Sequence, residues 1–201
     1  MNDRFLWADI TVDEDEARPE MVDAFLKRSN PTPLIVDVRV CTEDHELDCH
    51  SIDSLELILR HLPRIKELRI SCNPIHNDLG VPKMLEKAFS EYQIPLMESF
   101  ELSSYHEPWL HYGIDPQPSY APALRKLCLN NVIFDWGSPI FQNITELCIN
   151  LSEPDGFIGG EDEWMDIDQL FNIFGSSPNL TTLLLRFCIL EDITILDMKN
   201  V

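Results

Sequence analysis

The stretch Pro122-Ala-Leu124-Arg-Lys-Leu127-Cys-Leu129 carries the pattern that decides the fold, an aliphatic residue followed by x-x-[Leu/Phe]-x-[Leu/Ile]. Further copies of the pattern begin at Ile65, Met97, Ile144 and Leu180, and in four of the five copies a proline lies two residues before the start. The starts lie about 20 to 36 residues apart. A short strand motif that recurs at such intervals is typical of a leucine-rich-repeat-like solenoid.

Helical spacing of apolar residues predicts a helix before most of the strands. The predicted helices are Pro19–Arg28, Ser51–Leu62, Lys83–Tyr92 and Asp166–Phe174, and the alternating run Leu34–Val40 is a further strand. Helices that connect successive strands imply parallel pairing. The predicted fold class is therefore α/β, a leucine-rich-repeat-like solenoid with a curved parallel sheet, helices on its convex side and irregular repeats.

One interval is too short for a helix. Between the strands at Leu124 and Ile144, the segment Ile133–Pro139 is expected to return the chain as a loop or a single helical turn. Trp136, together with Phe134 and Phe141, is expected to fill the core there in place of a helix.

The chain is expected to form one domain over residues 1–201. Residues 1–33 are predicted to be a helical lead-in, and residues 34–201 to contain about six strand-centred repeats. The last repeat ends after Leu185 without an evident polar cap. Because an uncapped solenoid exposes an apolar end, self-association through that end is expected.

The charge of the chain is strongly negative, with 35 Asp and Glu residues against 15 Lys and Arg residues and a formal net charge of -20. Such a surface repels phosphate backbones and anionic membranes, so neither nucleic acid nor membrane is an expected partner. A protein partner is expected, and the charge favours a basic one. The acidic runs at residues 13–16 and 153–168 have the composition of solvated loops and helix starts.

The six cysteines are scattered without a Cys-x-x-Cys pair, and the first ten residues are polar and charged. No secretory leader and no apolar run of membrane-spanning length is evident. We therefore expect reduced thiols in a cytoplasmic or nuclear protein.

Metal-ligand residue types cluster only at Cys41, His45, Cys49 and His50. In a helix the first three would share a face, which is the basis of a zinc hypothesis, but the segment has the composition of an exposed acidic loop. No nucleophile elbow and no phosphate-binding glycine loop occurs. The chain is predicted not to be an enzyme and to need no cofactor and no metal.

Alternation along the strands predicts where a partner binds. If Leu68 and Ile70 point into the core, Glu67 and Arg69 lie on the concave face of the sheet. The predicted partner-binding residues of this face are Asp37, Arg39, Glu67, Arg69, Ser99, Glu101, Lys126, Cys128, Glu146, Cys148, Thr182 and Leu184. The alternative is that the long loops cover this face and that it binds nothing.

Three stretches carry a resemblance to a known family. They are Leu124-Arg-Lys-Leu-Cys-Leu-Asn-Asn-Val-Ile-Phe-Asp-Trp136-Gly-Ser-Pro139-Ile-Phe-Gln-Asn143-Ile-Thr-Glu-Leu147, Arg4-Phe-Leu-Trp7-Ala-Asp-Ile10 and Leu26-Lys-Arg-Ser29-Asn-Pro-Thr-Pro33-Leu34. The first resembles the leucine-rich-repeat region of fungal F-box-like proteins, in which a strand, a Trp-x-Ser-Pro turn and an Asn-Leu-Thr-x-Leu strand follow one another. The second resembles the leucine-tryptophan segment that directly follows the F-box in such proteins, and the third resembles the helix and strand that open their repeat region. The resemblance covers nearly the whole chain.

The resemblance implies the substrate receptor of a cullin-based ubiquitin ligase, in which an F-box docks the adaptor and the repeats capture the target. No Leu-Pro-x-Glu-like F-box motif occurs in this chain, so the implied role is the target-recognition part of such a receptor without its F-box. The alternatives are a free-standing repeat scaffold protein with no ubiquitin-ligase role, and a small zinc protein or metal-dependent enzyme.

Overall fold

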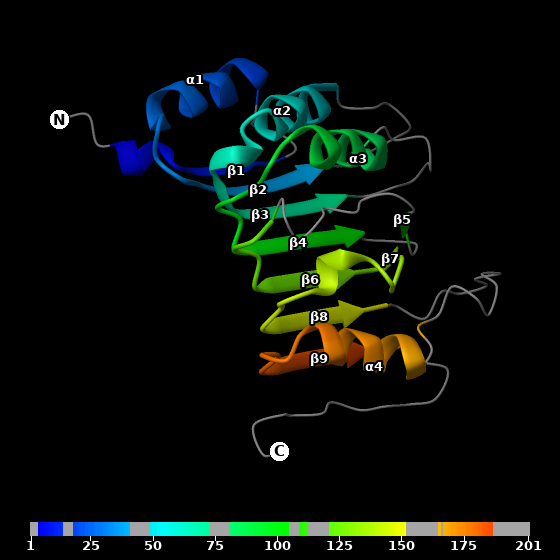
Figure 1. Ribbon diagram of the computed structural model, residues 1–201. Coiled ribbons are helices and arrows are strands. Elements are labelled where there is room, and N and C mark those ends of the chain that lie inside the picture. Colours follow the sequence, from blue (N-terminus) through cyan, green and yellow to red (C-terminus); the bar gives the residue numbers. More distant parts are fainter. Residues whose placement is uncertain are drawn as a thin grey trace.

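Seven parallel strands form one sheet in the order β1-β2-β3-β4-β6-β8-β9 (Figure 1). The computed structural model describes residues 4–13, 18–40, 49–72, 81–104, 109–111, 121–151, 165 and 167–186. The strands of the sheet are β1 (Asp9–Val12), β2 (Leu34–Val40), β3 (Ile65–Cys72), β4 (Ser99–Ser104), β6 (Lys126–Asn130), β8 (Glu146–Asn150) and β9 (Thr182–Arg186). Each strand pairs with the strand that precedes it along the sheet order in parallel register, so the predicted α/β class with a parallel sheet is confirmed.

Helices connect several of these strands. The α-helices are α1 (Pro19–Ser29), α2 (Cys49–Leu59), α3 (Val81–Glu91) and α4 (Ile167–Ser176), and the 3-10 turns are η1 (Arg4–Trp7), η2 (Leu62–Arg64) and η3 (Pro139–Phe141). A separate two-stranded sheet pairs β5 (Trp109–His111) with β7 (Val132–Phe134). The four predicted helices are thus present, each with ends shifted by one or a few residues.

Alternation of side chains builds the core, with one irregularity where Lys66 is inserted in β3 opposite Leu34 and Ile35 of β2. Along β3, Leu68 and Ile70 are buried, whereas Arg69 between them is exposed. The inward residues of the neighbouring strands are likewise buried and lie directly opposite, with Phe100 beside Leu68 and Leu102 beside Ile70. Since side chains on a strand point alternately to the two faces, all seven strands present an apolar row to the same side.

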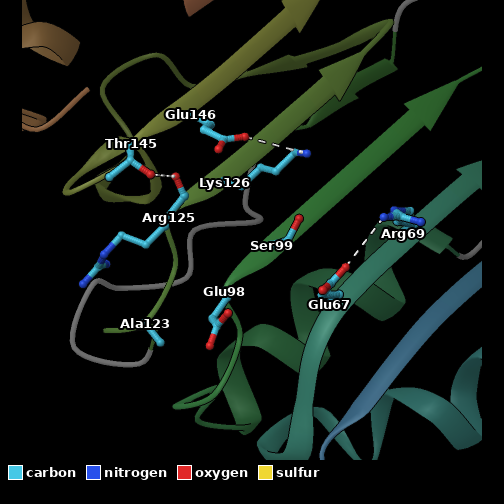
Figure 2. A pocket seen from close by; sticks show the side chains of 9 residues that line it. All are labelled: Glu67, Arg69, Glu98, Ser99, Ala123, Arg125, Lys126, Thr145 and Glu146. Carbon is cyan, nitrogen blue, oxygen red and sulfur yellow. Dashed lines mark hydrogen bonds and ion pairs between the residues drawn. The ribbon is translucent and has the colours of Figure 1, made fainter. Parts of the chain in front are cut away.

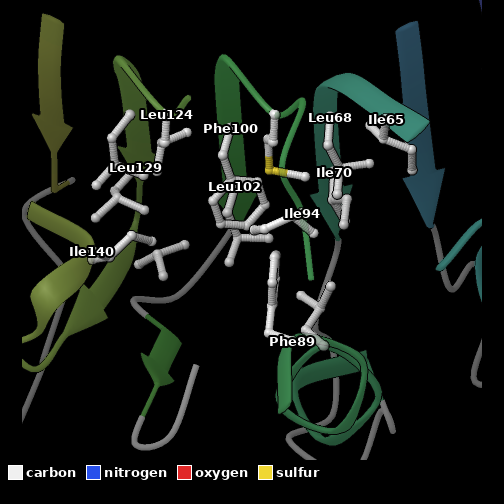
Figure 3. Close-up of a cluster of buried hydrophobic side chains, with 14 of the residues drawn as sticks. Ile65, Leu68, Ile70, Phe89, Ile94, Phe100, Leu102, Leu124, Leu129 and Ile140 are labelled. Atoms are coloured by element: carbon white, nitrogen blue, oxygen red, sulfur yellow. The ribbon is translucent and has the colours of Figure 1, made fainter. Parts of the chain in front are cut away.

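The helices cover that apolar side. Val22 of α1, Leu55 of α2, Leu85 of α3 and Leu170 of α4 belong to the same cluster of buried side chains as the inward residues of the strands. Figure 3 shows Phe89 of α3 directed at the strand residues, and its ring meets that of Phe100 edge to face with 5.4 Å between centroids. Burial against the sheet therefore stabilises the helices more than their own propensity does.

The recurrent prolines have a common structural role. In three copies of the pattern, the proline is the second residue of a turn closed by a backbone hydrogen bond: Met97 N–H donates to Ile94 O, Leu124 N–H to Ala121 O and Leu180 N–H to Ser177 O, at 3.3, 3.2 and 3.0 Å. In the fourth copy, Ile65 N–H donates to Leu62 O across Pro63. The fixed φ of proline suits this second position of a turn. In the last four copies, the first two residues lie before the strand, not in it.

The copy without a proline is closed differently. Asn143 adopts a positive φ of 61°, and Ile144 N–H donates to the Ser177 hydroxyl at 3.1 Å instead of closing a local turn. Ser177 also donates to the carbonyl of Phe141, so this buried serine at the end of α4 ties the turn to the next repeat.

The short interval holds no helix, as predicted, but its first residues, Ile133 and Phe134, belong to strand β7 and not to a loop. A 3-10 turn, η3, takes the place of a helix, and the Ser138 hydroxyl caps it by accepting from Ile140 N–H at 3.3 Å. Trp136 and Phe141 are both buried, with 5.9 Å between their ring centroids. The side chain of Phe134 lies outside the described residues.

The N-terminal segment differs from its prediction. Within residues 1–33, expected to be helical, Asp9–Val12 forms the edge strand β1 and pairs with β2, with Ile10 and Val12 fully buried. Four residues are too few for alternation to distinguish a strand from a turn, so pairing with β2 decides the conformation.

Substitutions at two adjacent positions of β4 test the assignment of faces. Leu102→Ala is expected to lower the free energy of unfolding by about 2–5 kcal/mol, because it leaves a cavity in the core. Glu101→Ala, one residue away on the opposite face, is expected to change it by less than about 1 kcal/mol, since the half-buried Glu101 side chain forms a partly exposed ion pair with Arg69. Urea denaturation of both variants measures the difference; equal losses would contradict the register.

Candidate functional site

The second face of the sheet carries polar side chains in rows, and we call it the open face. The structure places all twelve sequence-predicted residues there, half-buried or exposed. Cross-strand partners form a first row of Asp9, Ile35, Glu67, Ser99, Lys126, Glu146 and Thr182, and a second row of Thr11, Asp37, Arg69, Glu101, Cys128, Cys148 and Leu184. Because the partners are paired strand by strand, each row runs continuously across the sheet.

A third row lies one step further along the strands. It consists of Arg39, Ser71, Ser103, Asn130, Asn150 and Arg186, of which only Arg39 was predicted. Within it the Asn130 amide donates to the Ser103 hydroxyl at 3.0 Å. The sequence pattern ends one residue before this row, but the same alternation continued for one more step would have found it.

Opposite charges alternate on the open face. Arg69 lies between two carboxylates, with its guanidinium 3.6 Å from Glu67 Oε2 and 3.7 Å from Glu101 Oε2. Lys126 Nζ is 3.8 Å from Glu146 Oε2. Such partly exposed pairs each contribute about 0–1 kcal/mol, so they exchange partners readily when a ligand brings its own charges.

An open hollow of about 540 Å³ lies at the end of the open face where the strands begin. Figure 2 shows the nine residues that line it: Glu67, Arg69, Glu98, Ser99, Ala123, Arg125, Lys126, Thr145 and Glu146. Three are acidic and three are basic, so the hollow offers donors and acceptors of both charges. Four of them lie in the connections that precede the strands: Glu98, Ala123, Arg125 and Thr145. The alternation of side chains along a strand does not predict the position of residues in a connection.

Hydrogen bonds from side chains to backbone carbonyls hold the connections that line the hollow in place. The Thr145 hydroxyl donates to the Arg125 carbonyl at 3.2 Å, and the Arg125 guanidinium donates to the carbonyls of Leu124 and Pro122 at 2.6 and 3.0 Å. The walls of the hollow are thereby tied from one repeat to the next.

Cys128 and Cys148 form a pair at the centre of the second row. They are direct partners on the adjacent parallel strands β6 and β8, and both are half-buried free thiols. The thiols are hydrogen-bonded to each other, and the Asn130 amide lies 3.6 Å from Cys128 Sγ. The two thiols therefore titrate together.

The shared hydrogen bond separates their acidities. The bond from Cys128 stabilises a thiolate at Cys148 and lowers the pKa of Cys148 to about 7, with Arg186 and Lys126 adding to the effect and burial and Glu101 opposing it. The same bond, with burial and Glu101, raises the pKa of Cys128 well above its ordinary range. The first proton to leave the pair therefore leaves Cys148.

The zinc hypothesis falls largely outside the described residues. Cys41 and His45 are not among them, nor is the side chain of Cys49, and His50 is exposed in the first turn of α2. Within the described part of the chain, no group of three metal-ligating side chains lies together.

Comparison with protein-family models, with curated proteins and with solved structures finds no match for this chain. None of the helices in the described ranges is long and apolar enough to cross a bilayer.

The acidity of Cys148 is directly measurable. Alkylation of Cys148 by iodoacetamide is expected to accelerate with a midpoint near pH 7, because only the thiolate reacts. In Cys128→Ala the midpoint is expected to move upward, since the stabilising hydrogen bond is lost. Mass spectrometry after cleavage at Asp135, which lies between the two cysteines, follows each thiol separately. A wild-type midpoint at or above about 8.5, the ordinary value of a thiol, would contradict the assignment.

Proposed function

We propose that this chain is a non-catalytic protein–protein interaction domain whose open face captures a polypeptide segment of a partner. The observation that carries the proposal is the set of in-register rows of polar side chains, on the face of the sheet opposite to the one covered by the helices. A rigid sheet that presents aligned side chains is suited to recognition, because little conformational entropy is lost on binding.

The dimensions of the rows define the ligand. Neighbouring strands are spaced about 4.8 Å apart, so a row from β2 to β9 spans about 24 Å. An extended polypeptide covers that distance with about seven residues. A short extended segment that crosses the strands therefore matches the open face in length.

The charges define its chemistry. In the rows from β2 to β9, the acidic residues Asp37, Glu67, Glu101 and Glu146 are matched by the basic residues Arg39, Arg69, Lys126 and Arg186, and the edge strand β1 adds the exposed carboxylate of Asp9. The chain as a whole has a net charge of -20. The overall field attracts a basic partner, while the balanced face selects a segment that carries both charges in a complementary order.

The architecture proposed with this function is a leucine-rich-repeat-like solenoid. All-parallel strands in chain order, a proline turn before four of them and helical or 3-10 returns on one side support it. With the resemblance to F-box-like proteins, this supports the role of the target-recognition part of a ubiquitin-ligase receptor. The second candidate is a free-standing repeat scaffold.

Charge reversal at Arg69 or Lys126 tests the binding face. Peptides selected on the immobilised chain from a displayed library of mixed-charge segments are expected to bind Arg69→Glu and Lys126→Glu about five- to tenfold more weakly, a loss of about 1–1.4 kcal/mol per site. The melting temperature is expected to change little, because both side chains make only partly exposed ion pairs. Fluorescence anisotropy and thermal denaturation measure the two effects.

Lys87→Glu is the matched control. Lys87 lies exposed on α3 and forms an ion pair with Glu91, away from the open face, so its reversal changes the net charge equally. If Lys87→Glu weakens binding as much as Arg69→Glu, net charge alone governs binding and the open face is not the site. A large loss of thermal stability in Arg69→Glu would instead place that side chain in the core.

The ubiquitin-ligase role has its own test. Affinity purification of the native protein from its own cells is expected to recover a cullin adaptor, whereas the 201-residue chain expressed alone is expected to recover none, because it contains no F-box motif. Recovery of peptide-binding activity without any adaptor in the native preparation would favour the free-standing scaffold.

A further inference from the structure

The open face brings two cysteine thiols together, and the two differ in acidity. Cys128 and Cys148 are register partners on β6 and β8 and point to the same side of the sheet, with their thiols hydrogen-bonded. Flanking pairs Leu127–Leu147 and Leu129–Ile149, buried on the other side, hold the two strands in this register. The pair is therefore positioned by the fold before any reaction.

We propose that Cys128 and Cys148 form a dithiol site that reacts with small-molecule disulfides of the glutathione class and closes a reversible disulfide between β6 and β8. The site needs no binding partner, so it stands apart from the interaction proposed for the same face. Both thiols are half-buried, so a small disulfide reaches them from the solvent side of the sheet.

The reaction takes two balanced steps. The Cys148 thiolate attacks one sulfur of the small disulfide, which forms a mixed disulfide on Cys148 and releases one small thiolate. The Cys128 thiol then loses its proton to solvent and attacks Cys148 Sγ, which forms the Cys128–Cys148 bond and releases the second small thiol. In total two protein thiols are oxidised and one small disulfide is reduced to two thiols.

The roles of the two residues follow from their surroundings. Arg186 and Lys126 favour the thiolate on Cys148, whereas Glu101, the register partner of Cys128, disfavours a charge on either sulfur. Asp37 and Arg69 continue the same row, and Glu146 precedes Cys148 by two residues, beside Lys126. Cys148 is thus the attacking thiol and Cys128 the resolving thiol.

Strand spacing makes the bond labile. Direct partners on parallel strands lie about 4.8 Å apart, within the Cα range of disulfides, while a disulfide draws the Cβ atoms to about 3.5–4.5 Å. Closure therefore brings the two Cβ atoms closer together than the strand spacing, and because the buried rows hold that spacing, we expect the bond to be strained. A strained disulfide on a solvent-facing surface is readily reduced, which is the property of a regulatory bond and not of a structural one.

Peptide mapping tests the site on the whole 201-residue chain. The chain is incubated with glutathione disulfide at pH 7, quenched with an alkylating reagent and cleaved at Asp135, because no Lys or Arg lies between Lys126 and Arg186 for trypsin to separate the two cysteines. The expected product is a Cys128 peptide joined to a Cys148 peptide, which excess reduced glutathione separates again. Buried Cys72 is expected to remain unmodified and reports that the fold is intact.

Two single variants distinguish the roles. Cys128→Ser is expected to accumulate glutathione on Cys148, because the resolving thiol is missing. Cys148→Ser is expected to slow modification of Cys128 by about tenfold or more, because the attacking thiolate is missing. Circular dichroism spectra like that of the wild type establish that both variants are folded.

The proposal is overturned by any of three results: persistent glutathione on Cys148 of the wild type without closure, equal reaction of Cys128 with and without Cys148, or a closed bond that excess glutathione does not reduce. Peptide binding to the open face is measured in a separate experiment. Failure of the dithiol reaction can therefore be distinguished from failure of peptide binding.

Discussion

In-register pairing of apolar side chains across parallel strands is the constraint on which the rest of the structure depends. Leu68 beside Phe100 and Ile70 beside Leu102 exemplify the buried rows that every strand extends. A shift of one residue would expose these side chains and bury Arg69 between them. The register of the core therefore also sets the register of the open face, and the same pairing that buries leucines aligns carboxylates, cations and thiols on the other side.

Turn chemistry repeats this register from one strand to the next. Pro63, Pro95, Pro122 and Pro178 each occupy the second position of a hydrogen-bonded turn, so the same turn leads into each of four strands. Where the proline is absent, the Ser177 hydroxyl of a later repeat accepts from Ile144 N–H. A local device in four repeats is thus replaced by a tertiary hydrogen bond in the fifth, and the sheet continues without a break.

The open face differs in character from the chain that carries it. A chain with a net charge of -20 presents, in the rows from β2 to β9, acidic and basic residues in equal number and a central pair of thiols. Weak, exchangeable ion pairs leave the face free to rearrange for a ligand, whereas long-range attraction is governed by the whole surface. In the proposed function, local recognition by the open face and long-range attraction by the whole surface are therefore separate contributions.

The sequence by itself determined the α/β class, the helices, six of the seven strands and the face on which Arg69, Lys126 and Cys148 lie, because alternation along a strand is a local property with a period of two. Only the tertiary structure decided that Asp9–Val12 is a strand, since four residues pair only where β2 offers an edge. The tertiary structure also determined the position of the hollow, because its lining combines strand residues of the open face with residues from the connections before β4, β6 and β8. The acidity of Cys148 is tertiary as well, because its cause is a thiol twenty residues away in sequence and adjacent in space.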